Sequence, residues 1–298
     1  MLVRLAVLVR LAVLVLLAVL AGCSGGGPPG RGTEPAGCPP STQPAGLTCE
    51  LRAGDAVAHD LSASPAALAD AGRRTQDAYR ILGDHPEWDA AVLAELDPAL
   101  AAQSRHALAA FRALTSLDGR PSATLPAWRV VDPLPADTLR GYYAEAQRRY
   151  GVSWTVLAAV NLVETRMGRV VGLSTAGAQG PMQFMPPTWA AYGLGGDVWD
   201  PRDSIVGAAN YLAANGGADP ARLDRALRRY NNDARYVSAV RDYAAMMDAD
   251  PRAFLELHAW PVEYRTVAGD IALDPGYASD RRIPVGDWLA THPVPGAR

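Results

Sequence analysis

Apolar residues recur at helical spacing through most of the chain beyond residue 60. The first apolar face lies within residues 64–83 and consists of Leu68, Ala71, Thr75, Ala78, Tyr79 and Leu82. Ser64 can cap a helix, Pro65 fits its first turn, and Gly83 can end it. The spacing therefore predicts a helix over this range.

The same pattern continues downstream. Residues 87–117 carry a long apolar face, and Pro98 should divide it into two helices because proline breaks a continuous one. Further helices are predicted over 139–150, 153–163, 186–193, 204–214, 221–231 and 234–247. Alternation typical of strands is scarce until 262–273, where a hairpin is expected. We therefore predict an all-α protein with a short irregular or hairpin C-terminal tail.

The beginning of the chain has the features of an export signal. Arg4 and Arg10 precede an uninterrupted apolar stretch over residues 11–20, which is too short for a comfortable membrane span. The tetrapeptide Leu-Ala-Gly-Cys ending at Cys23 looks like a bacterial lipobox, which implies cleavage before Cys23 and lipidation of its thiol. An ordinary signal peptide with a coincidental cysteine is the alternative. A Gly/Pro-rich segment follows, as a flexible tether requires.

Composition narrows the class of partner. The chain has 298 residues, of which 49% are hydrophobic, and a net charge of −3. It is not basic enough to indicate a nucleic-acid partner. Once Cys23 is assigned to the anchor, Cys38 and Cys49 remain. An exported protein meets an oxidising compartment, which favours a disulfide between them over two free thiols.

One carboxylate stands alone in an apolar helix. Glu164 is the only Asp or Glu in residues 146–196, and it follows Leu157 and Val160 at helical spacing. A carboxyl at the edge of a core-facing helix should have a raised pKa, which suits a general acid at neutral pH. The alternative is a surface carboxylate paired with Arg166 or Arg169. Position alone leaves both possibilities open.

The residues after Glu164 suggest a ligand. Residues 174–180 are too glycine-rich for a helix interior and allow the backbone to approach a ligand closely. Gln183 adds an amide, and a set of apolar and aromatic side chains follows: Met182, Phe184, Met185 and Trp189. Together with the hydroxyl of Ser174, these groups are an inventory typical of sugar binding. For Met182 and Phe184 taken singly, core packing is the simpler interpretation.

The order of these residues resembles the lytic murein transglycosylases. The resemblance rests on Glu164, the phrase from Ser174 to Gly180, Met182-Gln183 and Tyr230-Asn231, and covers about residues 134–250. The phrases around Gly180 to Pro186 and Val198 to Pro201 lean toward the membrane-bound transglycosylase B type. Pro181 departs from the soluble type, which usually has leucine there, and the interval from Glu164 to Ser174 is one residue longer. The resemblance implies a lysozyme-like, goose-type helical catalytic domain.

The resemblance also implies roles for individual residues. Glu164 would be the catalytic acid and then the base, and Ser174 and Gln183 would orient the N-acetyl group and the sugar. Tyr230 and Asn231 would line the opposite wall, with weaker candidates for subsite surface at Met182, Phe184 and Tyr192. The acidic cluster of Asp197, Asp200 and Asp203 precedes a predicted helix. It suits turn and cap duties better than catalysis or metal binding.

The sequence thus predicts an exported, lipid-anchored enzyme of the bacterial cell envelope that cleaves the MurNAc–GlcNAc bond of peptidoglycan strands. A conventional glycosidase uses two carboxylates, and no second one is evident here, so a 1,6-anhydro-MurNAc product is expected. A lysozyme-type hydrolase and a non-catalytic wall-binding lipoprotein are the alternatives. No cofactor, metal or nucleic acid is expected. The expected layout is a signal peptide (1–22), a tether (23–60), a helical accessory region (61–120), the catalytic domain (134–250) and a tail (251–298).

Overall fold

The computed structural model describes residues 38–292. The predicted signal peptide and Cys23 lie outside the described residues, as does the first part of the predicted tether. Within the described part of the chain, no helix is long and apolar enough to cross a membrane.

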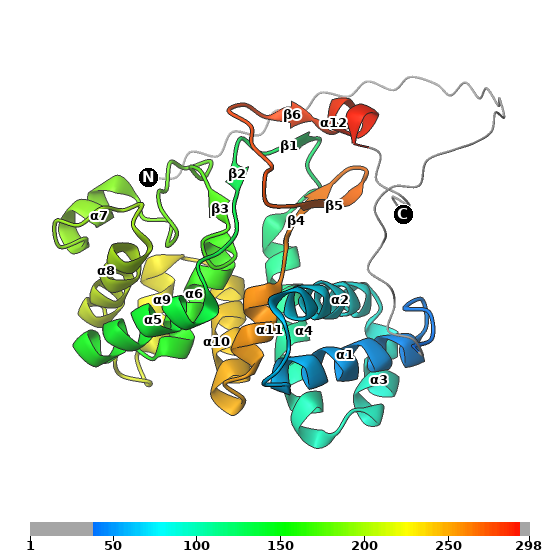
Figure 1. Ribbon diagram of the computed structural model, residues 1–298. Coiled ribbons are helices and arrows are strands. Elements are labelled where there is room, and N and C mark those ends of the chain that lie inside the picture. The colour runs from blue at the N-terminus through cyan, green and yellow to red at the C-terminus, as the bar shows by residue number, and fades with distance from the viewer. Residues whose placement is uncertain (1–37, 293–298) are drawn as a thin grey trace. The chain divides into compact units, whose positions relative to one another are not determined.

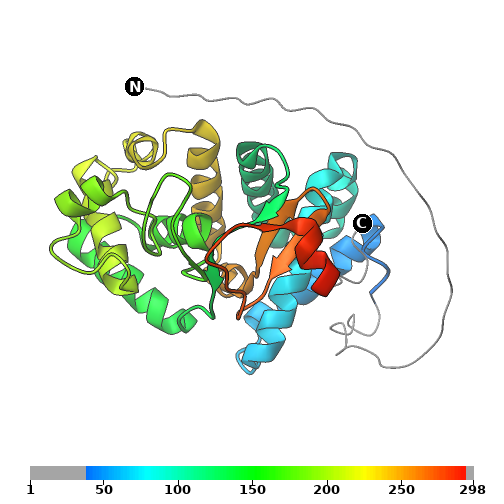
Figure 2. The same cartoon turned by 90° about the horizontal axis from the view of Figure 1, so that it is seen from above.

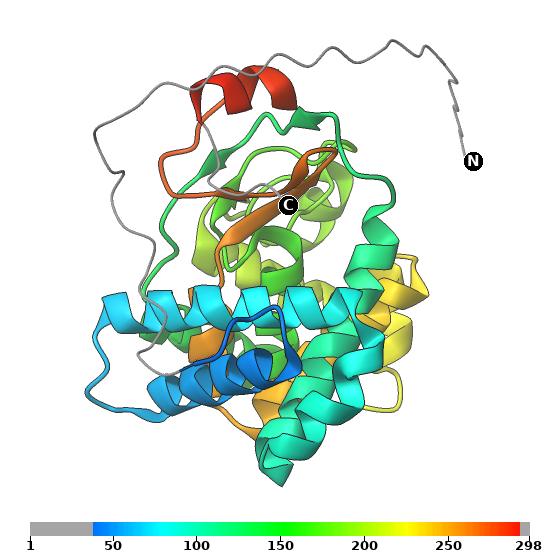
Figure 3. The same ribbon diagram turned by 90° about the vertical axis from the view of Figure 1, so that its right-hand side faces the viewer.

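Helices dominate the first part of the described chain. They are α1 (Pro44–His59), α2 (Pro65–Asp84), the 3-10 turn η1 (Pro86–Trp88), α3 (Asp89–Glu95) and α4 (Pro98–Asp118). Ser64 caps α2 as predicted, accepting a hydrogen bond from the Ala67 amide. Pro98 opens α4 behind an Asp97 cap, so the predicted division at Pro98 is confirmed. Helices α1 and α2 lie side by side (Figure 3).

A second group of helices follows a short extended connection. It comprises α5 (Ala136–Tyr150), α6 (Trp154–Thr165), α7 (Pro186–Tyr192), α8 (Pro201–Ala214), α9 (Leu223–Tyr230), α10 (Ala234–Ala249) and α11 (Ala253–Ala259). Helix α10 packs against both α4 and α6, and therefore joins the two groups (Figure 1). The all-α class is confirmed. Helix α11 was not predicted; unlike α7, which also has seven residues, it has no proline in its first turn and no glycine at its end.

One hydrophobic core runs through both groups of helices. It includes Leu47 and Leu108 from the first group and Leu157, Ile205 and Trp260 from the rest of the chain. Apolar side chains packed in one continuous core bind the segments together. Residues of the predicted accessory region 61–120 therefore share one core with residues 134–250, and residues 253–260 of the predicted tail belong to the same core.

The strands of the described residues form three small antiparallel pairs. They are β1 (Thr124–Leu125) with β6 (Ile283–Pro284), β2 (Arg129–Val130) with β3 (Val170–Val171), and β4 (Val262–Thr266) with β5 (Gly269–Leu273). The β4–β5 pair is the predicted hairpin. A short helix, α12 (Val285–Thr291), follows β6. A second apolar cluster, including Leu125, Val130 and Val262, packs these strands together. In Figure 2, seen from above, the orange and red C-terminal strands lie in front of the helices.

The structure corrects the predicted tether. Residues 44–59, placed within the 23–60 tether by composition, form helix α1, and its Leu47 and Leu51 are fully buried. Proline and glycine near the start of the segment suggested flexibility, but Pro44 instead occupies the first turn of the helix. Cys38 and Cys49 form the expected disulfide, which links the start of the described chain to α1.

Candidate active site

Helix α6 positions Glu164 one residue before its end. Ser153 caps the helix, and the chain leaves it through left-handed conformations at Arg166 and Met167. The Thr165 hydroxyl then donates to the carbonyl of Pro181 at 2.6 Å, and the Asn161 amide donates to the same oxygen at 2.9 Å. The end of α6 is thus fastened to the loop that follows.

The carboxyl of Glu164 faces Tyr236 on α10. The Tyr236 hydroxyl donates a 2.7 Å hydrogen bond to Oε1 of Glu164. Burial raises the pKa of Glu164 from 4.5 to about 7, while the hydrogen bond from Tyr236 lowers it in part. Near neutral pH the group is therefore poised to give or take a proton.

The alternative of a surface ion pair does not hold. Among residues 38–292, no Arg lies at ion-pair distance from Glu164. The guanidinium of Arg169 donates instead to the carbonyl of His258 at 2.9 Å. The guanidinium of Arg166 lies over the ring of Trp260, 5.8 Å from its centroid.

Glu164 lines a cavity of about 410 Å³. Its walls come from segments far apart in the sequence: Asn231 and Tyr236 from the second group of helices, Arg120 and Trp128 from the connection, and Tyr264 from β4. Of the predicted site residues, the cavity brings together Glu164 and Asn231. It mixes aromatic faces with polar groups, which suits a carbohydrate.

Two predicted substrate-binding residues brace the loop instead of lining this cavity. Ser174 Oγ accepts hydrogen bonds from the amides of Ala176 and Ala178, at 3.2 and 3.0 Å. Gln183, whose φ is 51°, donates through Nε2 to the carbonyl of Gly180 at 2.9 Å. Both side chains therefore hold the glycine-rich loop in shape.

The predicted subsite surface is corrected at two positions. Met182 and Phe184 are 0% and 3% exposed and belong to the hydrophobic core, as the simpler interpretation held. Tyr230 donates to the carbonyl of Met182 at 2.6 Å, and its ring stacks on that of Tyr236 at 6.5 Å. The half-buried Tyr192 packs edge-on against Tyr211 and does not line the Glu164 cavity.

The acidic cluster performs the expected turn and cap duties. Asp200 accepts a hydrogen bond from the amide of Asp203 and caps α8. Asp203 accepts from the amide of Asp197, and Asp197 accepts from the amide of Trp199. Backbone amides thus explain the presence of these carboxylates.

A second carboxylate reaches the cavity from the C-terminal hairpin. Glu263 on β4 lines the same cavity as Glu164, which contradicts the expectation that no second carboxylate would be near. Burial raises the pKa of Glu263, and the nearby guanidinium of Arg80 opposes the rise. Its Oε2 lies 3.3 Å from Nε of Arg80, which also pairs with Asp270. The carboxylate of Glu263 is therefore already paired with the guanidinium of Arg80.

The sequence offers no clear signal for Tyr236 or Glu263. Tyr236 stands in an amphipathic helix, where an aromatic residue is typical of a core. Glu263 stands in a strand of alternating pattern, where a polar residue is typical of a solvated face. Only the packing of α10 and β4 brings them to Glu164.

Carboxylates and an imidazole gather at one further place. Ligand atoms of Asp55, His59 and Asp250 all lie within 4.8 Å of one another. These side chains already contact each other, with His59 Nε2 3.1 Å from Asp250 Oδ2. None of the three lines the Glu164 cavity.

Comparison with known protein families identifies a domain within the second group of helices. A family model described as the transglycosylase SLT domain matches residues 141–249. Residues 141–249 are a transglycosylase SLT domain. The lysozyme-like class of fold expected from the sequence is thereby confirmed, and the match to this domain includes Glu164, Asn231 and Tyr236.

A curated relative extends the comparison. Membrane-bound lytic murein transglycosylase F of Thiobacillus denitrificans is 33% identical over 125 residues. The aligned part is 40% of this chain and 26% of the relative, so the chain spans about a quarter of that protein's length. No solved structure matches the chain. The cavity walls at Arg120, Trp128 and Glu263 lie outside the SLT domain match.

Proposed function

We propose that the protein is a peptidoglycan lytic transglycosylase. The observation that carries the proposal is the protonatable carboxyl of Glu164, with a pKa of about 7, in a cavity of an SLT domain. The name of the curated relative supports the same activity. The substrate is the glycan strand of peptidoglycan, cleaved at the bond between MurNAc and GlcNAc.

In this proposal Glu164 first acts as the acid. Its protonated carboxyl gives a proton to the leaving glycosidic oxygen, and the C1–O bond breaks. The substrate's own N-acetyl oxygen stabilises the cationic carbon, an exception that the two-carboxylate rule allows. The resulting Glu164 carboxylate then takes the proton of the C6 hydroxyl, whose oxygen closes the 1,6-anhydro ring.

Tyr236 and Asn231 complete the proposed machinery. The hydrogen bond from Tyr236 favours the charged form of Glu164, which moderates the effect of burial on its pKa. Asn231 offers an amide to the same cavity and can bind a sugar hydroxyl or acetamido group. Ser174 and Gln183 act at a distance by shaping the loop, rather than by orienting the N-acetyl group themselves.

Glu263 makes a lysozyme-type hydrolase the second candidate. A carboxylate across a cavity from a general acid can activate water, which gives a reducing end instead of an anhydro end. The ion pair between Glu263 and Arg80 argues against this role, because it holds the carboxylate in a network of fixed charges.

Product masses separate the two candidates. Digestion of purified peptidoglycan by the wild type should give fragments lighter by one water than hydrolysed ones. Glu164→Gln keeps the volume of the side chain but cannot transfer a proton, so activity should fall by roughly 10²–10⁴-fold. Fragments with reducing ends would identify a hydrolase. Unchanged activity of a folded Glu164→Gln variant would remove Glu164 from the mechanism.

Localisation in the cell envelope through a lipid anchor at Cys23 is part of the proposal. It rests on the lipobox-like sequence that ends at this cysteine and on the Gly/Pro-rich segment after it. Cys23→Ala should move the protein from the membrane fraction to the soluble fraction, as followed by fractionation and immunoblotting. Retention of the variant in the membrane fraction would contradict the anchor.

A further inference from the structure

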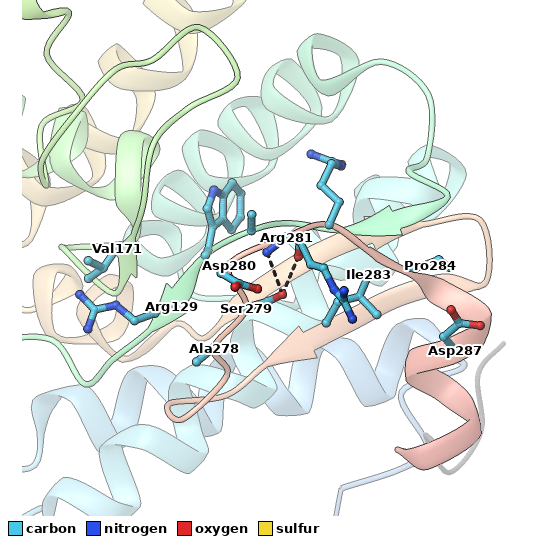
Figure 4. Close-up of a pocket in the computed structure, with 12 residues that line it drawn as sticks. Arg129, Val171, Ala278, Ser279, Asp280, Arg281, Ile283, Pro284 and Asp287 are labelled. Atoms are coloured by element: carbon cyan, nitrogen blue, oxygen red, sulfur yellow. Dashed lines mark hydrogen bonds between the residues drawn. The ribbon is translucent and has the colours of Figure 1, made fainter.

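A larger pocket lies beside the Glu164 cavity. It has a volume of about 1150 Å³ and is formed by residues 127–129, Val171, residues 278–284 and Asp287. Figure 4 shows Arg129 and Val171 at one end and Asp287 at the other, with Asp280 and Arg281 between them. All of its residues except Val171 lie outside the SLT domain match, so this pocket is an addition to that domain.

Backbone pairing ties this pocket to the SLT domain. Strand β2 pairs with β3 on one edge, and on the other edge Arg129 forms a bridge with Ala278. The amide of Ser279 also donates to the carbonyl of Trp128 at 2.9 Å. The segment that carries Asp280 and Arg281 is thus held in a fixed position against the domain.

The pocket and the Glu164 cavity share a wall. Trp128 lines both of them. Arg282 lines the larger pocket and donates to the side chains of Ser122 and Tyr264, which line the Glu164 cavity, at 3.2 and 3.1 Å. The larger pocket is therefore the direct neighbour of the Glu164 cavity.

The charges of the pocket are mixed. It contains Arg129, Arg281 and Arg282 together with Asp280 and Asp287. Within residues 38–292, no carboxylate lies at ion-pair distance from the guanidinium of Arg129 or Arg281. Arg129 and Arg281 can therefore bind carboxylates of a ligand, since guanidinium groups bind carboxylates in bidentate geometry. The two aspartates would repel a wholly anionic polymer but can accept from an ammonium group.

We propose that this pocket binds the peptide stem of a peptidoglycan strand. The stem is attached to MurNAc, so it must lie beside the cavity that holds the glycan. It carries free carboxylates for Arg129 and Arg281 and, where it contains a diamino acid, an ammonium group for Asp280 or Asp287. The inference rests on the proposed function and extends it to a preference for peptide-bearing strands.

Two matched substrates test the preference. Glycan strands with intact stems and strands stripped by an amidase are digested by the full chain, and KM and kcat are measured for each. Wild type should have a lower KM for strands with stems. Arg129→Gln combined with Arg281→Gln should raise that KM about tenfold and leave kcat and the digestion of stripped strands unchanged. Arg148→Gln, which removes an exposed arginine on α5, is the matched control.

A binding measurement keeps the test independent of catalysis. The free stem peptide is titrated into the full chain and followed by NMR, together with an N-acetylated form and a carboxamide form. Binding by wild type that is weakened in the carboxamide form and in the double variant supports the proposal. Absence of peptide binding, or equal KM values for both strands in wild type, overturns it. Peptide binding without any cleavage would instead contradict the proposed function.

Discussion

The hydroxyl of Tyr236 donates a 2.7 Å hydrogen bond to Oε1 of Glu164, across 72 residues of sequence. It connects α10 to the end of α6 within the SLT domain, and α10 also packs against α4 of the first group of helices. This contact and burial act on the pKa of Glu164 in opposite directions, and burial has the larger effect. The balance keeps the carboxyl protonatable near neutral pH.

Tyr236→Phe should shift the pH dependence of the proposed activity. The lost hydrogen bond lowers the pKa of Glu164 in the wild type, so its removal should raise that pKa further above about 7. Because the protonated carboxyl is the active form, the fall in kcat/KM at high pH should move to higher pH. A pH series on peptidoglycan measures this shift. Tyr192→Phe, at a residue outside the Glu164 cavity, should leave the profile unchanged.

Stability should depend on the ionisation of Glu164. The pKa is raised from 4.5 to about 7, so the folded state favours the protonated form. The contribution of this group is fully present below its unfolded pKa and is lost as pH rises through 7. Relative to Glu164→Gln, the free energy of unfolding of wild type should fall by roughly 3 kcal/mol at most between about pH 5 and pH 8. Urea denaturation at both pH values tests it, and a constant difference would contradict the raised pKa.

Gly180→Ala should destabilise the loop that follows α6. The φ of Gly180 is 72°, and an added Cβ would lie 1.9 Å from the carbonyl oxygen of Val198. Gly177→Ala is a matched control, because its φ is 86° and an added Cβ would meet nothing within 4 Å. The control should cost about 1 kcal/mol through backbone strain alone. Gly180→Ala should cost roughly 1–3 kcal/mol more by overpacking, as thermal denaturation would show.

Removal of the disulfide should weaken the attachment of α1 without affecting chemistry. Cys38 and Cys49 are 11 residues apart in sequence. A loop of this size corresponds to about 3 kcal/mol in the chain-entropy account. The double variant Cys38→Ser, Cys49→Ser should lose stability of this order in denaturant titrations. Its kcat should equal that of wild type, since neither cysteine lines the Glu164 cavity.

Local sequence by itself determined most of the helices and the identity of the central carboxyl. Ser64, Pro98 and Asp200 act on backbone groups within three residues of themselves, so their cap and helix-start roles are visible in the sequence. The isolation of Glu164 in an apolar helix predicted its raised pKa, because burial follows from helical periodicity. The pairing of Cys38 with Cys49 was predicted because they are the two cysteines that remain once Cys23 is assigned to the anchor.

The tertiary structure alone decided what surrounds Glu164. Tyr236 and Glu263 reach the cavity through the packing of α10 and β4, over separations that no local pattern encodes. Packing also buries Met182 and Phe184 in the core. Ser174 and Gln183 form hydrogen bonds with backbone groups of their own loop. A residue type states which bonds a side chain can make. Which partner it finds depends on which surfaces the hydrophobic core brings together.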